Sequence, residues 1–120
     1  MKNLIRLALV PVFALCATAA LAHAQLQKST PGVGSTVAGT SELKLEFSEG
    51  VEPKFTSVVV TNASGAAVPA GKPSVDASDS KILILKFAAP LGAGVYSVTW
   101  KAVSVDTHHT QGNFIFTVKP

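Results

Sequence analysis

Residues 42–48 read Glu-Leu-Lys-Leu-Glu-Phe-Ser, and their alternation of apolar and polar side chains decides the fold class. Leu43, Leu45 and Phe47 fall on one side of an extended chain, which is the period-two pattern of a strand with one buried face. Comparable short runs lie at 25–29, 55–61, 81–87, 95–104 and 113–119, with a further one near Ala67. The sequence therefore predicts an all-β domain.

Clusters of turn-forming residues separate these runs, at 62–65, 69–73 and 90–94, and no stretch after residue 24 has a helical period. Six or seven short strands at this spacing predict an antiparallel β-sandwich of immunoglobulin-like or Greek-key type. Tyr96 follows the Pro-Leu-Gly-Ala-Gly loop and is expected to form a tyrosine corner. Trp100 is expected in the core, together with Phe47, Phe87, Phe114 and Phe116.

The amino terminus has the pattern of a secretory signal peptide. Lys2 and Arg6 precede an apolar run at 7–21, which is shorter than a membrane span. Small residues allow a cut after Ala22 or after Ala24, and only the first makes His23 the new terminus. We predict a signal peptide at 1–22, a single domain at 23–120 and a periplasmic location.

Removal of that segment changes the charge and the available ligands. The whole chain has 10 Lys and Arg against 7 Asp and Glu; without Lys2 and Arg6 the balance is 8 − 7 = +1. No cluster of basic residues remains, which excludes a nucleic-acid binder. The only Cys and the only Met, Cys16 and Met1, also precede residue 23, so the domain has no disulfide, thiolate or thioether.

Three residues form the strongest candidate for a metal site. A terminal His23 would offer an amine and an imidazole to one ion, because both groups belong to the same residue. Asp106 and His108 would project to the same side of an extended segment. Two imidazoles, an amine and a carboxylate make a tetragonal nitrogen and oxygen set, which favours Cu(II). The Asp106 carboxylate would either bind the ion or orient an imidazole.

Several stretches together resemble the CopC-type periplasmic copper-binding, or copper resistance, protein family. They are the terminal His23, Ser29–Pro31, Leu45–Glu49, Pro90–Tyr96 and Trp100–His108 followed by Gly112. The resemblance implies a seven-stranded antiparallel Greek-key β-sandwich or barrel, related to immunoglobulin and cupredoxin-like folds. It also implies one Cu(II) per chain, held by His23, Asp106 and His108.

Three positions qualify the resemblance. Glu49 matches an acidic residue that some members place beside the copper, although a solvated residue at a strand end is the alternative. His109 stands where many relatives have Pro, and we expect it not to bind the metal. The segment at 62–75 has no counterpart of the Met-rich loop that forms a Cu(I) site in some relatives. We therefore predict no Cu(I) site of the Met type.

The predicted function is non-enzymatic: copper sequestration, copper resistance or delivery to a membrane transporter, which the resemblance suggests is of the CopD type. The protein is expected to be a monomer. One alternative is a copper oxygenase with a histidine brace, which the small size and the carboxylate ligand disfavour. Another is a metal-free sandwich for adhesion or assembly, which a cut after Ala24 would favour.

Overall fold

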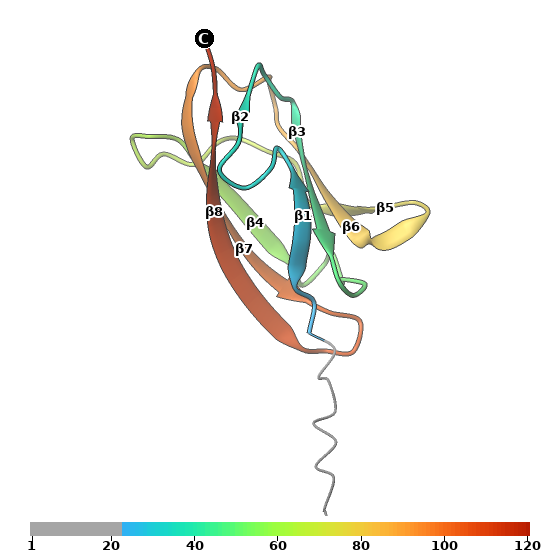
Figure 1. Ribbon diagram of the computed structural model, residues 1–120. Coiled ribbons are helices and arrows are strands. Elements are labelled where there is room, and N and C mark those ends of the chain that lie inside the picture. The colour runs from blue at the N-terminus through green and yellow to red at the C-terminus, as the bar shows by residue number, and fades with distance from the viewer. Residues whose placement is uncertain (1–22) are drawn as a thin grey trace, which may run out of the picture.

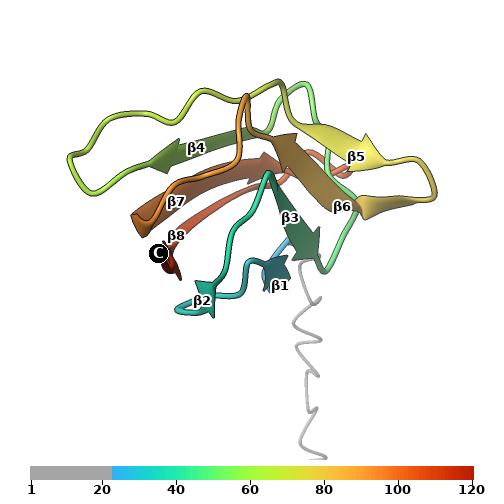
Figure 2. The same ribbon diagram turned by 90° about the horizontal axis from the view of Figure 1, so that it is seen from above.

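The computed structural model describes residues 23–120, so the predicted signal peptide lies outside the described residues. Eight strands in this range form two four-stranded sheets that pack face to face (Figure 1). The view from above in Figure 2 shows the two layers. No helix in 23–120 is long and apolar enough to cross a membrane.

Each sheet combines strands that are distant in sequence. The first sheet is antiparallel throughout and has the order β1 (Leu26–Thr30), β3 (Glu42–Phe47), β6 (Asp79–Lys86), β5 (Ser74–Asp76). The second has the order β2 (Thr36–Val37), β8 (His109–Val118), β7 (Gly94–Val103), β4 (Ser57–Thr61). The chain passes between the sheets after β1, β2, β3, β4 and β6, so neither sheet forms from a single continuous segment.

The space between the sheets is filled by the alternating apolar side chains of the long strands. Leu43, Leu45 and Phe47 on β3 are at most 1% exposed. Trp100 on β7 meets Phe47 edge to face, with ring centroids 5.2 Å apart. The other predicted core aromatics, Phe87, Phe114 and Phe116, are also buried. The prediction of an all-β sandwich is confirmed.

The strand count is eight rather than seven. Strands β2 and β5 have two and three residues, too few for an alternating pattern to predict them. Residue Ala67 forms only an isolated bridge with Thr61 and no separate strand. Strand β2 runs parallel to β8, so one strand pair departs from the expected antiparallel arrangement.

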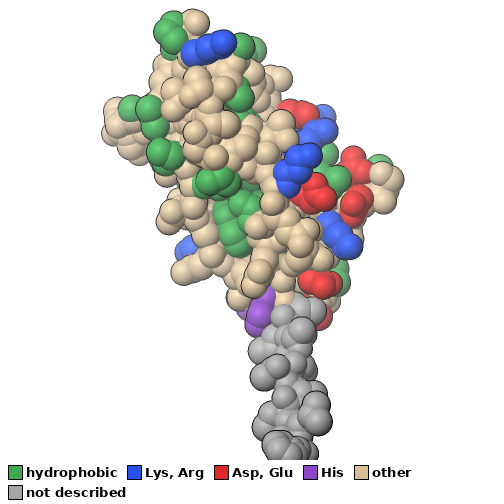
Figure 3. All heavy atoms as spheres, in the orientation of Figure 1, with side chains coloured by type: hydrophobic (Ala, Val, Ile, Leu, Met, Phe, Trp, Pro, Cys, Tyr) green, Lys and Arg blue, Asp and Glu red, His purple; other side chains and the backbone are tan. Residues whose placement is uncertain are grey.

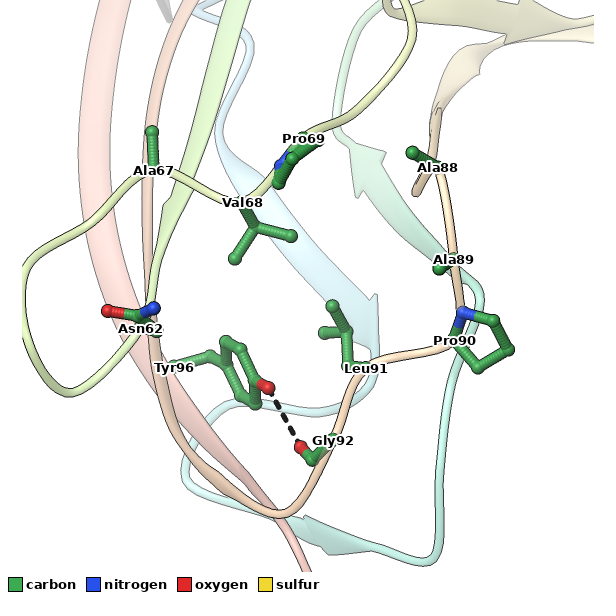
Figure 4. Close-up of a pocket in the computed structure, with 10 residues that line it drawn as sticks. All are labelled: Asn62, Ala67, Val68, Pro69, Ala88, Ala89, Pro90, Leu91, Gly92 and Tyr96. Carbon is green, nitrogen blue, oxygen red and sulfur yellow. Dashed lines mark hydrogen bonds between the residues drawn. The ribbon is translucent and has the colours of Figure 1, made fainter.

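Tyr96 closes the end of the sandwich where β7 begins. Its hydroxyl donates a 2.8 Å hydrogen bond to the carbonyl oxygen of Gly92, four residues earlier, which confirms the tyrosine corner (Figure 4). The ring stacks on Phe116 in the core, with centroids 5.5 Å apart. A pocket of about 270 Å³ lies beside it, between the loops that follow β4 and β6. Its lining is mainly Ala, Val, Pro and Leu, with Asn62 as a polar side chain.

Candidate metal centre

The opposite end of the sandwich brings together three parts of the chain that are far apart in sequence. The segment before β1, the residues after β3 and the turn between β7 and β8 meet there (Figure 1). Histidine is visible on the surface at this end of the molecule (Figure 3). Every residue predicted to bind metal belongs to one of these three parts.

Hydrogen bonds fix the segment before β1. The hydroxyl of Ser48 donates to the carbonyl oxygen of His23 at 2.8 Å and accepts from the amide of Gln25 at 2.9 Å. From the other sheet, Thr110 Oγ1 donates to the carbonyl oxygen of Ala24 at 2.6 Å. The Ala24 side chain is completely buried. The main chain at His23 is therefore held to one sheet through the carbonyl of His23 and to the other sheet through the carbonyl of Ala24.

The turn between β7 and β8 is built around the fully buried Ser104. Its hydroxyl donates to Asp106 Oδ1 and accepts from the His108 amide at 3.2 Å. Its own amide donates to the carbonyl oxygen of His108 at 2.9 Å, and Thr107 takes a left-handed conformation, with φ of 73°. This conformation is uncommon outside glycine and closes the turn tightly.

The segment that contains Asp106 and His108 has a different conformation from the one that the sequence predicts. The prediction placed Asp106 and His108 on the same side because it treated their segment as extended. The residues instead lie in a tight turn, and the turn brings the His108 Nδ1 atom within 3.1 Å of Asp106 Oδ2. The two side chains meet as expected, but for a different geometric reason.

The imidazole rings of His23 and His108 lie together, with centroids 4.9 Å apart and an interplanar angle of 85°. The Nδ1 atom of each ring is buried and has no hydrogen-bond partner among residues 23–120. The contact between His108 Nδ1 and Asp106 therefore lacks the geometry of a hydrogen bond, although its length is short enough. Buried polar atoms normally have partners, and each exception requires an explanation. Imidazole nitrogens beside a carboxylate are groups of the kind that bind metal ions in proteins.

The surroundings of the Asp106 carboxyl favour its ionised form. The hydrogen bond from Ser104 is the largest cause that lowers its pKa below the ordinary value, and the contact with His108 acts in the same direction. Desolvation opposes these effects but does not outweigh them. An ionised carboxylate at this position would balance part of the charge of a cation bound beside it.

The predicted site residues differ in how far the structure brings them together. His23 contacts His108, and His108 contacts Asp106. No group of three or more His, Cys, Asp or Glu side chains within 23–120 is close enough to form a metal site from side chains alone. The further donor that the sequence predicts is a main-chain amine, which is not a side chain. Glu49 is half-buried and directly follows Ser48.

His109 points away from the other histidine of its motif. It begins β8, is exposed, and lines a surface hollow with Phe55 and Lys101. His108 ends the turn and His109 is the first residue of β8, so the two neighbours belong to different elements and their side chains have different surroundings.

Three hydroxyl residues that support the site had no assigned role in the sequence analysis. They are Ser48, Ser104 and Thr110. Two of them lie in the Leu45–Glu49 and Trp100–His108 stretches, so their position next to the motifs was the available signal. The hydrogen bonds of Ser48 and Thr110 join parts of the chain that are far apart in sequence, which no spacing reveals, whereas those of Ser104 lie within its own turn.

Fold and site together define a small β-sandwich with a histidine and carboxylate centre at one end. The chain belongs to the CopC family, since the CopC domain profile matches residues 26–119. Copper resistance protein C of Escherichia coli is 37% identical over 109 residues, or 86% of each chain. Its namesake in Pseudomonas syringae pv. tomato is 35% identical over 95% of this chain and 97% of its own.

Solved structures agree with this assignment. PcoC, described as a methionine-rich copper resistance protein from E. coli, is 40% identical and superposes with a TM-score of 0.74, covering 82% of this chain and all of PcoC. CopC from Methylosinus trichosporium OB3b is 29% identical with a TM-score of 0.75, covering 82% and 95%. Membership in this family of copper resistance proteins supports the prediction that the protein is not an enzyme.

Proposed function

We propose that the protein is a periplasmic Cu(II)-binding protein whose mature chain begins at His23. The observation that carries this proposal is the pair of buried, unpaired Nδ1 atoms of His23 and His108 next to Asp106. Metal–nitrogen bonds are about 2 Å long. Rings whose centroids are 4.9 Å apart can therefore bind one ion from adjacent positions.

The amine of a terminal His23 would supply a further donor. The amine and the Nδ1 atom of one histidine close a six-membered chelate ring around a metal ion, whereas Nε2 of the same ring cannot reach. The unpaired atom of His23 is Nδ1, as this chelate requires. With His108 and the Asp106 carboxylate, the donor set contains three nitrogens and one oxygen. Such a set suits tetragonal Cu(II), which also has the highest affinity among the divalent ions of its series.

The oxidation state follows from the donor types. Cu(I) is selected by thiolate and thioether ligands. Residues 23–120 contain neither Met nor Cys, although the similar structure of PcoC is described as methionine rich. The pocket beside Tyr96, at the far end, offers only apolar side chains and one amide. We assign the protein one Cu(II) and no Cu(I) site of the Met type.

Glu49 is assigned a supporting role. It follows Ser48, whose hydroxyl binds the His23 carbonyl oxygen. A carboxylate at this end of the sandwich would attract a divalent cation through its charge, whether or not it touches the ion.

The biological role proposed is sequestration of copper or its delivery to a membrane transporter of the CopD type, with the protein acting as a monomer. The names of two relatives, copper resistance protein C, support the first role. Delivery is supported by similarity to a longer protein, the copper transport protein CutJ of Bacillus subtilis. This chain matches it at 33% identity over 81% of its own length and 18% of CutJ. A segment like this chain is thus part of a protein named for copper transport.

The intact mass of the secreted protein, measured with and without one equivalent of Cu(II), tests the proposal directly. A chain that begins at His23 and retains one copper ion would support it. A chain that begins at Gln25 and retains no copper would contradict it and favour a metal-free sandwich module. A synthetic mature chain with one residue added before His23 is the matched control, because it keeps every side chain of the domain and converts the amine of His23 into a peptide amide.

A further inference from the structure

Ser48, which is not a candidate metal ligand, makes several hydrogen bonds to the amino-terminal segment. It follows β3 directly and is half-buried. Its hydroxyl donates to His23 O and accepts from Gln25 N, and its own amide donates to Gln25 O at 2.8 Å. One serine therefore makes three hydrogen bonds to the main chain on either side of Ala24.

A second anchor reaches the same segment from the opposite sheet. Thr110 lies on β8, and its hydroxyl binds the carbonyl oxygen of Ala24 at 2.6 Å. Strands β3 and β8 belong to different sheets. The main chain of residues 23–25 is therefore held from two sides, and the direction in which His23 leaves the sandwich is fixed.

We propose that Ser48 is a positioning residue of the copper centre, with Thr110 as its partner from the other sheet. The inference rests on the proposed function and concerns which donors of the terminal residue reach the ion. An amino-terminal residue can chelate Cu(II) in two ways: through its amine and its carbonyl oxygen, or, in histidine, through its amine and Nδ1. The Ser48 hydroxyl occupies the carbonyl oxygen of His23 and leaves the Nδ1 atom without a partner. It therefore selects the imidazole chelate.

The same hydroxyl also binds a main-chain amide that could otherwise serve as a copper ligand. Cu(II) bound at a flexible peptide terminus can displace the proton of a nearby backbone amide and bind the nitrogen. The amide of Gln25 is already donated to Ser48 Oγ, so its proton is held in place. Ser48 thus engages the carbonyl oxygen of His23 and the amide of Gln25, which favours the amine, the two imidazoles and Asp106 as donors.

The test uses the mature chain beginning at His23 and the variant Ser48→Ala. Cu(II) affinity is measured by competition with a chelator, and the donor set by electron paramagnetic resonance and the visible absorption band. We expect affinity to fall about 10-fold to 100-fold, as is typical when a group that orients a metal ligand is lost. We also expect a changed spectrum, because the carbonyl oxygen and the amide of the segment become available. Ser48→Thr keeps the hydroxyl and should restore both properties.

Ser64→Ala is the matched control. Ser64 also donates a hydroxyl hydrogen bond, to Asn62 Oδ1 at 2.7 Å, in the turn after β4. Its loss should leave copper affinity and spectrum unchanged. In the metal-free protein, faster hydrogen exchange at the Gln25 amide in Ser48→Ala would report the released segment independently of copper.

The outcomes separate this inference from the proposed function. Copper binding by the parent chain with an unchanged affinity and spectrum in Ser48→Ala would overturn the positioning role alone. Absence of copper binding by the parent chain would overturn both. Should Ser48→Ala fail to fold, Thr110→Val removes the second anchor while keeping the side-chain shape. A normal spectrum and affinity in that variant would then overturn the inference.

Discussion

The imidazole of His23 stands edge-on to that of His108, and neither ring has a hydrogen-bond partner for its buried Nδ1 atom. Two elements from opposite ends of the sequence create this pair: the segment before β1 and the turn between β7 and β8. A hydroxyl network fixes each element separately, through Ser48 and Thr110 on one side and Ser104 on the other. The fold thus holds the two imidazoles side by side in the arrangement that the proposed copper centre requires.

The two adjacent histidines should respond very differently to substitution. His108→Ala removes a proposed ligand that contacts His23, and we expect Cu(II) affinity to fall more than about 100-fold, beyond the usual effect of an outer-shell change. His109→Ala should change affinity little, because that side chain lies on the exposed face near Phe55 and Lys101. Chelator competition on both variants measures the difference. Equal losses would show that the wrong imidazole has been assigned.

Copper affinity should depend on pH through nitrogen ligands rather than through the carboxylate. The pKa of Asp106 is lowered by the hydrogen bond from Ser104, so this group stays ionised well into the acid range. The reference pKa values are about 8 for a terminal amine and about 6.5 for imidazole, and protons compete with the metal below these values. Apparent affinity should therefore decline steeply as the pH falls from about 8 to 5.

Chelator competition repeated across this pH range measures the dependence. Asp106→Asn is the informative comparison, because it removes the carboxylate charge while retaining similar shape. Its affinity should be lower throughout, with a similar slope against pH. An affinity of the parent chain that stays constant over the range would contradict the proposed ligands.

The packing of Trp100 against β8 predicts a large effect of a small substitution. A Cβ atom at Gly112 would lie 2.6 Å from Cζ2 and 2.8 Å from Cε2 of the Trp100 ring. Since the ring is buried between the sheets, it has little room to move. Gly112→Ala should reduce the free energy of unfolding by about 1–3 kcal/mol, as overpacked cores typically do. Urea denaturation measures the loss, with Gly39→Ala as control because no atom lies within 4 Å of that position.

The sequence predicts those parts of the molecule that depend on alternation. Strands β3, β6 and β7 were predicted within two residues of their ends, because each carries a regular inward row of apolar side chains. Strand β8 begins at His109 rather than near Asn113. The reason is that its first inward positions are Thr110 and Gly112, which give no apolar signal. The residue types in the sequence suggested His23, Asp106 and His108 as candidate ligands, and this assignment stays a prediction. The hydroxyls of Ser48 and Thr110, which hold the segment at His23, make long-range contacts that no sequence pattern shows.

Substitution of Ser104 tests how far its hydroxyl stabilises the turn between β7 and β8. Its hydroxyl is completely buried and is shared between Asp106 and the His108 amide. Ser104→Ala leaves this amide with no hydroxyl partner and releases the Asp106 carboxylate, so the free energy of unfolding should fall by about 1–3 kcal/mol.

The same variant should raise the pKa of Asp106 toward its ordinary value, because the main cause of the lowered pKa is removed. A carboxyl whose pKa is lowered by folding contributes stability above its unfolded pKa and loses it as the pH falls through the folded value. The difference in thermal stability between the parent chain and Ser104→Ala should therefore shrink below about pH 4. Thermal unfolding from neutral to acid pH measures this change. A difference that stays constant across the range would show that the Ser104 hydroxyl stabilises the turn without regard to the charge of Asp106.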